Sequence, residues 1–302
     1  MYSKIMALTY GIENHPVFSS IKKGFMLTIP VIITGTVTLL IVNFPVAGLQ
    51  NFLTEFGGGF IRQLLLFVYG STVNFMSGYL LLSVSYYYSA TFPEKNPLLR
   101  MLAMITALAS FLASFGGPFG TLTLDSFGPV GVFTALVCAI CAPRFFFFLS
   151  RWQPGRHRAY APGSDLHYRS SMASILPVFI CVFCFSMANL ALRLFFQVGN
   201  FNELISNALI GMFRSVHNEL ANGLLFTLML NLLWVFGIHG GNALDPVAKI
   251  IFAEQAGGNG LITKSFLDNF TVPGGCGATV CLLLALLLAD RSRSNRELAL
   301  SA

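Results

Sequence analysis

Long apolar runs separated by short polar gaps dominate this chain. Seven windows of 18 to 31 residues hold no Asp, Glu, Lys or Arg, namely 24–54, 63–93, 101–124, 126–143, 170–192, 220–244 and 269–289. About 20 apolar residues in a helix cross the hydrocarbon core of a bilayer. The pattern therefore predicts an all-α, polytopic membrane protein with about six to eight transmembrane helices.

The polar breaks place the individual elements. Two stretches, 46–59 and 197–221, are amphipathic and predict helices at the membrane surface. Between and around them the apolar runs predict six spans, at 25–42, 63–90, 98–115, 129–149, 172–196 and 222–238.

The chain changes character after residue 238. Residues 239–270 are too polar to span a membrane, and Gly and Pro interrupt them repeatedly. Non-helical backbone at membrane depth survives only where it is buried in protein or lines a cavity, and broken segments of this kind mark the binding sites of transporters. We therefore predict a re-entrant, Gly-rich hairpin here, followed by a last apolar run at 272–289. The number of crossings after residue 238 stays open.

Composition and charge agree with a membrane location. Hydrophobic residues make up 55% of the 302 residues and charged residues only 10%, against about 25% charged in soluble domains. The net charge of +6 does not indicate a nucleic-acid partner, because the basic residues form no stripe with interleaved aromatics.

The basic residues instead lie in the gaps between spans, where they orient a membrane protein. They predict a cytoplasmic N-terminus and a cytoplasmic loop at 151–171. This loop is interpreted as solvated and held by anionic headgroups, or else as a docking surface for a cytoplasmic partner. Met1 to Lys23 is polar, and no small-residue cleavage site follows the first apolar run, so we expect no cleavable signal peptide.

Two C-x-x-C pairs, Cys138 with Cys141 and Cys181 with Cys184, lie inside apolar windows without a nearby His. Reactive thiols need a polar or electropositive setting, so we interpret these cysteines as small apolar residues on membrane helices. We expect neither a metal site nor a cofactor.

The strongest constellation of polar groups directly follows the sixth predicted span. His239, Gly240, Asn242 and Asp245 occur within seven residues, among glycines that open the backbone. Ionisable groups at membrane depth usually face a polar cavity and have a function. We predict these four residues as a substrate-binding site. The alternative is that His239 only compensates helix-terminal carbonyls.

Three motifs carry a family resemblance. Leu233-Trp-Val-Phe-Gly-Ile-His-Gly240 resembles a motif of the membrane permease subunit (enzyme IIC) of the phosphotransferase system, in its lactose/cellobiose/diacetylchitobiose branch. Pro273-Gly-Gly-Cys-Gly-Ala-Thr279 is similar to a second motif of that branch. Ser170-Ser-Met-Ala-Ser-Ile-Leu-Pro177 is more weakly similar to a third.

The resemblance implies a homodimeric carrier in a bacterial inner membrane. It implies one IIC-like membrane domain over 1–302, with five spans in 24–196 and with the sixth span, hairpin and last apolar run in 197–302. The sugar, a β-linked disaccharide, would be bound at the hairpin and phosphorylated on its 6-hydroxyl by a separate cytoplasmic IIB protein, which IIA serves. The chain would thus belong to a sugar phosphotransferase complex without carrying the phosphoryl donor.

The resemblance also implies a catalytic role for His239, which would lie beside the reacting hydroxyl and take its proton. Asn242 and Asp245 are added from their spacing, as partners for sugar hydroxyls.

Two departures leave alternatives open. The family continues into a further hairpin with an Asn-Glu-Pro motif, and that C-terminal third is not in this sequence. The N-terminal Ile12-Glu-Asn-His-Pro16 is closer to IIC-like modules of bacterial cyclic-di-nucleotide signalling proteins. The alternatives are therefore a sugar-sensing module without transport, or a truncated inactive fragment.

Overall fold

The computed structural model describes residues 11, 14–55, 59–94, 96–115, 124–152, 165–216 and 218–235, with isolated positions between 241 and 252. Every regular element in these ranges is helical, which confirms the predicted all-α class. The chain divides into two compact units, Met1–Ile205 and Ser206–Ala302. Each is described by itself.

Five of the described helical segments are long and apolar enough to cross a membrane. They are Pro16–Val42, Phe60–Ser89, Pro97–Phe115, Pro129–Arg151 and His167–Phe196. These segments coincide with the first five predicted spans and make the protein polytopic. The predicted sixth span falls on a shorter apolar helix, α10 (Glu219–Val235). The predicted hairpin at 239–270, apart from a few isolated positions, and the last apolar run lie outside the described residues, so the total of six to eight crossings stays a prediction.

The second span is two helices rather than one. α4 (Phe60–Thr72) passes through the 3₁₀ turn η2 (Val73–Phe75) into α5 (Met76–Ser89). The tighter turn breaks the regular α-helical hydrogen bonding at mid-span. Before it, α3 (Ala47–Glu55) follows α2 (Pro16–Val42) and falls on the amphipathic stretch predicted at 46–59.

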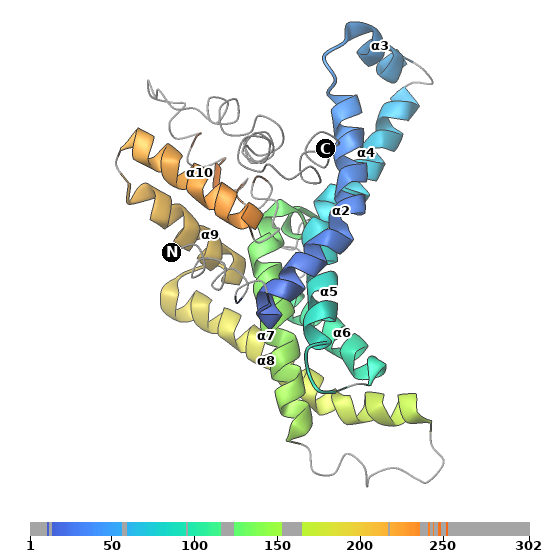
Figure 1. Ribbon diagram of the computed structural model, residues 1–302, viewed down its shortest axis with the longest axis vertical. Coiled ribbons are helices and arrows are strands. Elements are labelled where there is room, and N and C mark those ends of the chain that lie inside the picture. The colour runs from blue at the N-terminus through green and yellow to red at the C-terminus, as the bar shows by residue number, and fades with distance from the viewer. Residues whose placement is uncertain are drawn as a thin grey trace, which may run out of the picture. The chain divides into compact units, whose positions relative to one another are not determined.

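The first unit is a bundle in which α2 lies beside α4 and α5 (Figure 1). α5 packs in turn on α6 (Pro97–Phe115) and α7 (Val132–Arg151), and α8 (Leu166–Phe196) packs on both of these. The 3₁₀ turns η3 (Leu124–Phe127) and η4 (Pro129–Gly131) precede α7. The ring of Phe127 stacks on Phe75 with centroids 4.6 Å apart, so this turn packs against the junction of α4 and α5.

Two glycines of α2 allow this close packing. A Cβ atom on Gly24 would collide with the side chain of Val84 on α5 and would lie 3.0 Å from its backbone nitrogen. A Cβ on Gly35 would collide with Thr72, at the end of α4. Small residues let membrane helices approach backbone to backbone. The earlier glycine, Gly24, meets the later residue Val84, and the later glycine, Gly35, meets the earlier residue Thr72, so α2 runs antiparallel to α4 and α5.

Replacing Gly24 with Ala is expected to lower the stability of the folded protein by about 1–3 kcal/mol, because overpacking displaces neighbouring backbone. Gly70 is the matched control, since it is also helical but a Cβ added to it would meet no atom within 4 Å. Gly70→Ala should be neutral or slightly stabilising. Thermal unfolding of both variants in mild detergent measures the difference, and equal melting temperatures would show that the close approach of α2 and α5 is unimportant.

The second unit contains the end of α9 (Phe201–Arg214), the helix within which the division between the units falls, and α10. Aromatic rings connect its elements: Phe213 of α9 lies 6.0 Å from Phe226 of α10, and Phe226 lies 5.3 Å from Phe252. The helical residues Leu244, Val247 and Ala248 are buried as well. The predicted surface helix at 197–221 is thus shorter, and it buries an apolar face.

Candidate functional site

The four residues predicted to bind the substrate, His239, Gly240, Asn242 and Asp245, lie outside the described residues. The predicted site therefore stays a prediction from motif and spacing. The described residues of the first unit carry an open groove and two buried polar clusters. Sequence reasoning missed each of them.

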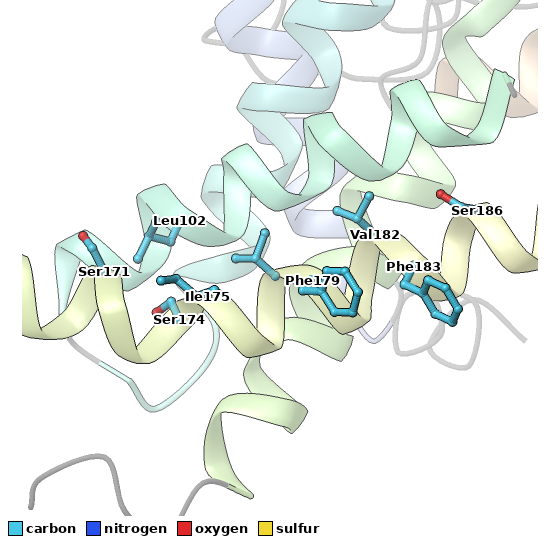
Figure 2. A pocket seen from close by; sticks show the side chains of 9 residues that line it. Leu102, Ser171, Ser174, Ile175, Phe179, Val182, Phe183 and Ser186 are labelled. Atoms are coloured by element: carbon cyan, nitrogen blue, oxygen red, sulfur yellow. The ribbon is translucent and has the colours of Figure 1, made fainter. Parts of the chain in front are cut away.

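The groove lies between α6 and α8 and has a volume of about 580 Å³, within the range of small-molecule sites. Figure 2 shows α6 running along α8, with Ser171 and Ser186 toward opposite ends of the row of lining side chains. The buried Ser174 also lines the groove, and the remaining lining residues are apolar: Leu102, Ile175, Val178, Phe179, Val182 and Phe183.

This groove has the chemistry of an apolar binding surface. The Ser174 hydroxyl donates to the backbone oxygen of Ser170 at 2.7 Å, so its hydrogen is used within its own helix. Phe179 and Phe183 stack with ring centroids 5.9 Å apart and are both exposed. A sugar needs several convergent polar groups, and this lining does not supply them. The groove is therefore not a second sugar site.

Two of the four cysteines interpreted as small apolar residues, Cys138 and Cys181, have polar contacts. The Cys138 sulfur on α7 lies 3.4 Å from the Ser114 hydroxyl, and the Cys181 sulfur on α8 lies 3.8 Å from the Ser110 hydroxyl. Both serines are on α6, so this buried cluster links three helices. Among the described residues, no group of three or more His, Cys, Asp or Glu side chains could hold a metal ion.

Asn189, a polar residue inside the fifth apolar span, joins two helix ends. Its side-chain nitrogen donates to the backbone oxygen of Ala113 at 3.3 Å, and its side-chain oxygen accepts from the backbone N–H of Phe201 at 3.0 Å. Nearby, the Thr134 hydroxyl donates to Asn202 at 2.8 Å. The first turn of α9 is thus tied to α6, α7 and α8. The sequence feature that could have indicated this junction is Asn189 itself, a polar residue inside the apolar run 170–192.

Basic residues gather at one end of the first unit, which we call the basic end. α5 and α7 finish there and α6 and α8 begin there, because Phe92 stacks on Phe147 and Asn96 donates to Ser170. α2 begins at the same end, since Gly24 lies against Val84. The described basic residues of these helix ends are Lys22, Lys23, Arg100, Arg151 and Arg169.

These features define a class of protein. The described part of the chain is a polytopic helical membrane protein with close helix packing and with basic residues gathered at one end of its first unit. Its more particular identity comes from comparison with known proteins.

No family model matches the chain. It is 22% identical over 318 residues to the PTS system oligo-beta-mannoside-specific EIIC component of Bacillus subtilis, a match covering 95% of this chain and 68% of that protein. It is 25% identical over 325 residues to the lichenan permease IIC component of Bacillus subtilis, covering 98% and 69%.

The fold is that of a solved IIC transporter. Its match to the crystal structure of ChbC, the IIC component of the N,N'-diacetylchitobiose-specific phosphotransferase system, has a TM-score of 0.66 at 21% identity, covering 98% of this chain and 73% of that one. The chain is therefore a homologue of phosphotransferase-system IIC components. The resemblance read from the sequence motifs is confirmed.

Proposed function

We propose that this chain is the sugar-binding and translocating IIC component of a phosphotransferase system, acting on a β-linked disaccharide. The observation that carries the proposal is the extent of the similarity. IIC permease components align with nearly all of the chain, and the fold of a IIC transporter covers 98% of it. Both of these Bacillus relatives have the names of phosphotransferase-system or permease components, and neither name describes a signalling protein, so these comparisons do not support the sensor alternative.

The proposed binding site is the motif after the sixth apolar span. His239 would hydrogen-bond the 6-hydroxyl of the sugar and take its proton during phosphorylation, since an imidazole exchanges protons near neutral pH. Gly240, which has no side chain, would let the sugar approach the backbone, and Asn242 and Asp245 would bind its other hydroxyls. The phosphoryl group would come from a separate IIB protein, and IIA would recharge that protein.

We further propose a homodimer whose basic end faces the cytoplasm. The gathering of Lys22, Lys23, Arg100, Arg151 and Arg169 at one end of the bundle supports this orientation, because positively charged residues are retained on the cytoplasmic side. The N-terminus and the loop at 151–171 then lie inside the cell.

Transport itself is tested with the purified chain in proteoliposomes that enclose the cognate IIB, IIA and a phosphoenolpyruvate-driven phosphoryl supply. Labelled cellobiose is expected to accumulate as its phosphate. Omission of IIB is the matched control and should leave no phosphorylated sugar. Equilibrium sugar binding without uptake, under conditions where the IIB protein is phosphorylated, would contradict the permease function and favour sensing.

Orientation is tested by labelling a single cysteine at Ser164 in a cysteine-free background. A membrane-impermeant maleimide should leave Ser164→Cys unmodified in intact cells and modify it after permeabilisation. Thr54→Cys, near the end of α3, is the matched control and should react from outside. The reverse pattern of labelling would invert the proposed topology.

A further inference from the structure

We propose that the groove between α6 and α8 binds one acyl chain of an anionic phospholipid, with the lipid phosphate at the basic end. This inference concerns a different surface from the sugar site and does not depend on the proposed function. It rests on the groove's exposure, its length and the charges beside one of its ends.

The groove is open on the outer surface of the first unit. Its lining residues Ile175, Phe179 and Phe183 are 58%, 62% and 52% exposed. α8 is a candidate membrane span, so the groove lies at the depth of the hydrocarbon core. Water does not fill such a hollow, because a bound water needs two to four polar partners and the wall is almost entirely apolar. A flexible apolar chain needs no hydrogen bonds and gains dispersion contacts with the lining side chains.

The groove also has the length of an acyl chain. Ser171 and Ser186 are 15 residues apart on one helix, which corresponds to about 22 Å at 1.5 Å per residue. One leaflet of the hydrocarbon core is about 15 Å deep, half of the whole. A lipid chain from one leaflet therefore fits along the groove even when α8 is tilted (Figure 2).

Positive charge marks where the headgroup belongs. The Asn96 Nδ2 atom lies 3.5 Å from the Ser170 Oγ atom. This contact brings the beginnings of α6 and α8 together beside Ser171. Arg169 and Arg100 lie within one turn of that contact. The Arg100 Nε is buried and has no acceptor among the described residues, although its Nη2 donates to the Glu94 backbone oxygen at 3.5 Å.

Such a basic end attracts a phosphate. Each Arg near an anionic membrane surface contributes about 1 kcal/mol of attraction, and basic pockets between membrane helices recognise lipid headgroups. A second copy of the chain is the alternative occupant, because a two-fold interface would bury the same surface of both copies.

Native mass spectrometry of the purified full chain tests the site, with phosphatidylglycerol and phosphatidylcholine of equal chain length as probes. The wild-type chain is expected to retain one phosphatidylglycerol at least about fivefold more strongly than phosphatidylcholine. Arg169→Gln and Arg100→Gln should each weaken that preference by about fivefold. Arg193→Gln is the matched control, because Arg193 lies beyond the opposite end of the groove on the same helix, and it should leave the preference unchanged.

A second pair of variants tests the groove itself. Ile175→Trp fills the groove and should weaken lipid retention about tenfold. The neighbouring Leu176 is 53% exposed but does not line the groove, so Leu176→Trp should bind lipid normally. Equal retention by the two Trp variants, or equal binding of the two lipids to the wild type, would overturn the proposal. Conversion of a dimer to a monomer by Ile175→Trp, with lipid retention intact, would assign the groove to a protein interface instead.

Discussion

Replacing His239 with Ala is expected to lower the rate of sugar phosphorylation by about 10²–10⁴-fold, the usual contribution of a positioned general base. Binding should suffer far less. One hydrogen bond to a neutral hydroxyl contributes about 0.5–1.5 kcal/mol, which corresponds to at most about tenfold weaker affinity. Single-turnover phosphorylation by phosphorylated IIB measures the first quantity, and calorimetric titration with the sugar measures the second.

Asn242→Ala is the matched comparison, because Asn242 is assigned to binding alone. It should weaken affinity by a similar factor and leave most of the phosphorylation rate at saturating sugar. If His239 only compensates helix-terminal carbonyls, His239→Ala would lower stability slightly and change neither quantity. Unchanged affinity in both variants, with folded protein, would rule out this motif as the sugar site.

Replacing Asn189 with Leu is expected to destabilise the first unit by about 2–6 kcal/mol. Ala113 lies in the last turn of α6, whose final four carbonyl oxygens have no partner within the helix, and Phe201 is the first residue of α9, whose first N–H groups likewise lack one. Asn189 satisfies one group of each kind and is only 4% exposed. Leucine would leave both backbone groups without a partner, at about 1–3 kcal/mol each.

Thermal unfolding in mild detergent should show a melting temperature lower by at least about 5 °C, and hydrogen exchange should quicken at the first turn of α9. Asn43→Leu is the control, since Asn43 is exposed and its side chain donates to Leu39 in its own helix, at 3.0 Å. It should shift the melting temperature little. Comparable shifts in the two variants would mean that the junction at Asn189 has no special role.

Much of the fold could be predicted from the sequence, because the bilayer imposes a strong constraint. A run such as 98–115 has no favourable alternative to a membrane helix, since every backbone group must find a partner inside hydrocarbon, and the structure places α6 at 97–115. The polar gaps between apolar runs likewise located helix ends to within a few residues, since the span predicted at 25–42 ends where α2 ends, at Val42. The family resemblance depended on short Gly-rich motifs. Glycine is favoured where the backbone must come close to a ligand or to another segment, so such motifs tolerate few other residue types.

Other features were beyond the sequence. The apolar pattern gave the second span as one helix, because apolarity does not distinguish α-helical from 3₁₀ backbone at Val73–Phe75. Cys138 and Cys181 looked like plain apolar residues, because their serine partners are on another helix and are brought to them only by packing. The predicted binding residues around His239 remain a prediction from motif and spacing.

The sequence by itself thus determined the all-helical membrane class, the positions of five spans and the kinship with IIC components, since each depends on local apolarity or on a contiguous motif. Only the tertiary structure decided how the helices face one another. It placed Gly24 against Val84, made Asn189 the partner of two distant helix ends, and opened a groove between α6 and α8. These features depend on contacts between residues far apart in the chain, and the pattern of apolar positions along the sequence does not predict such contacts.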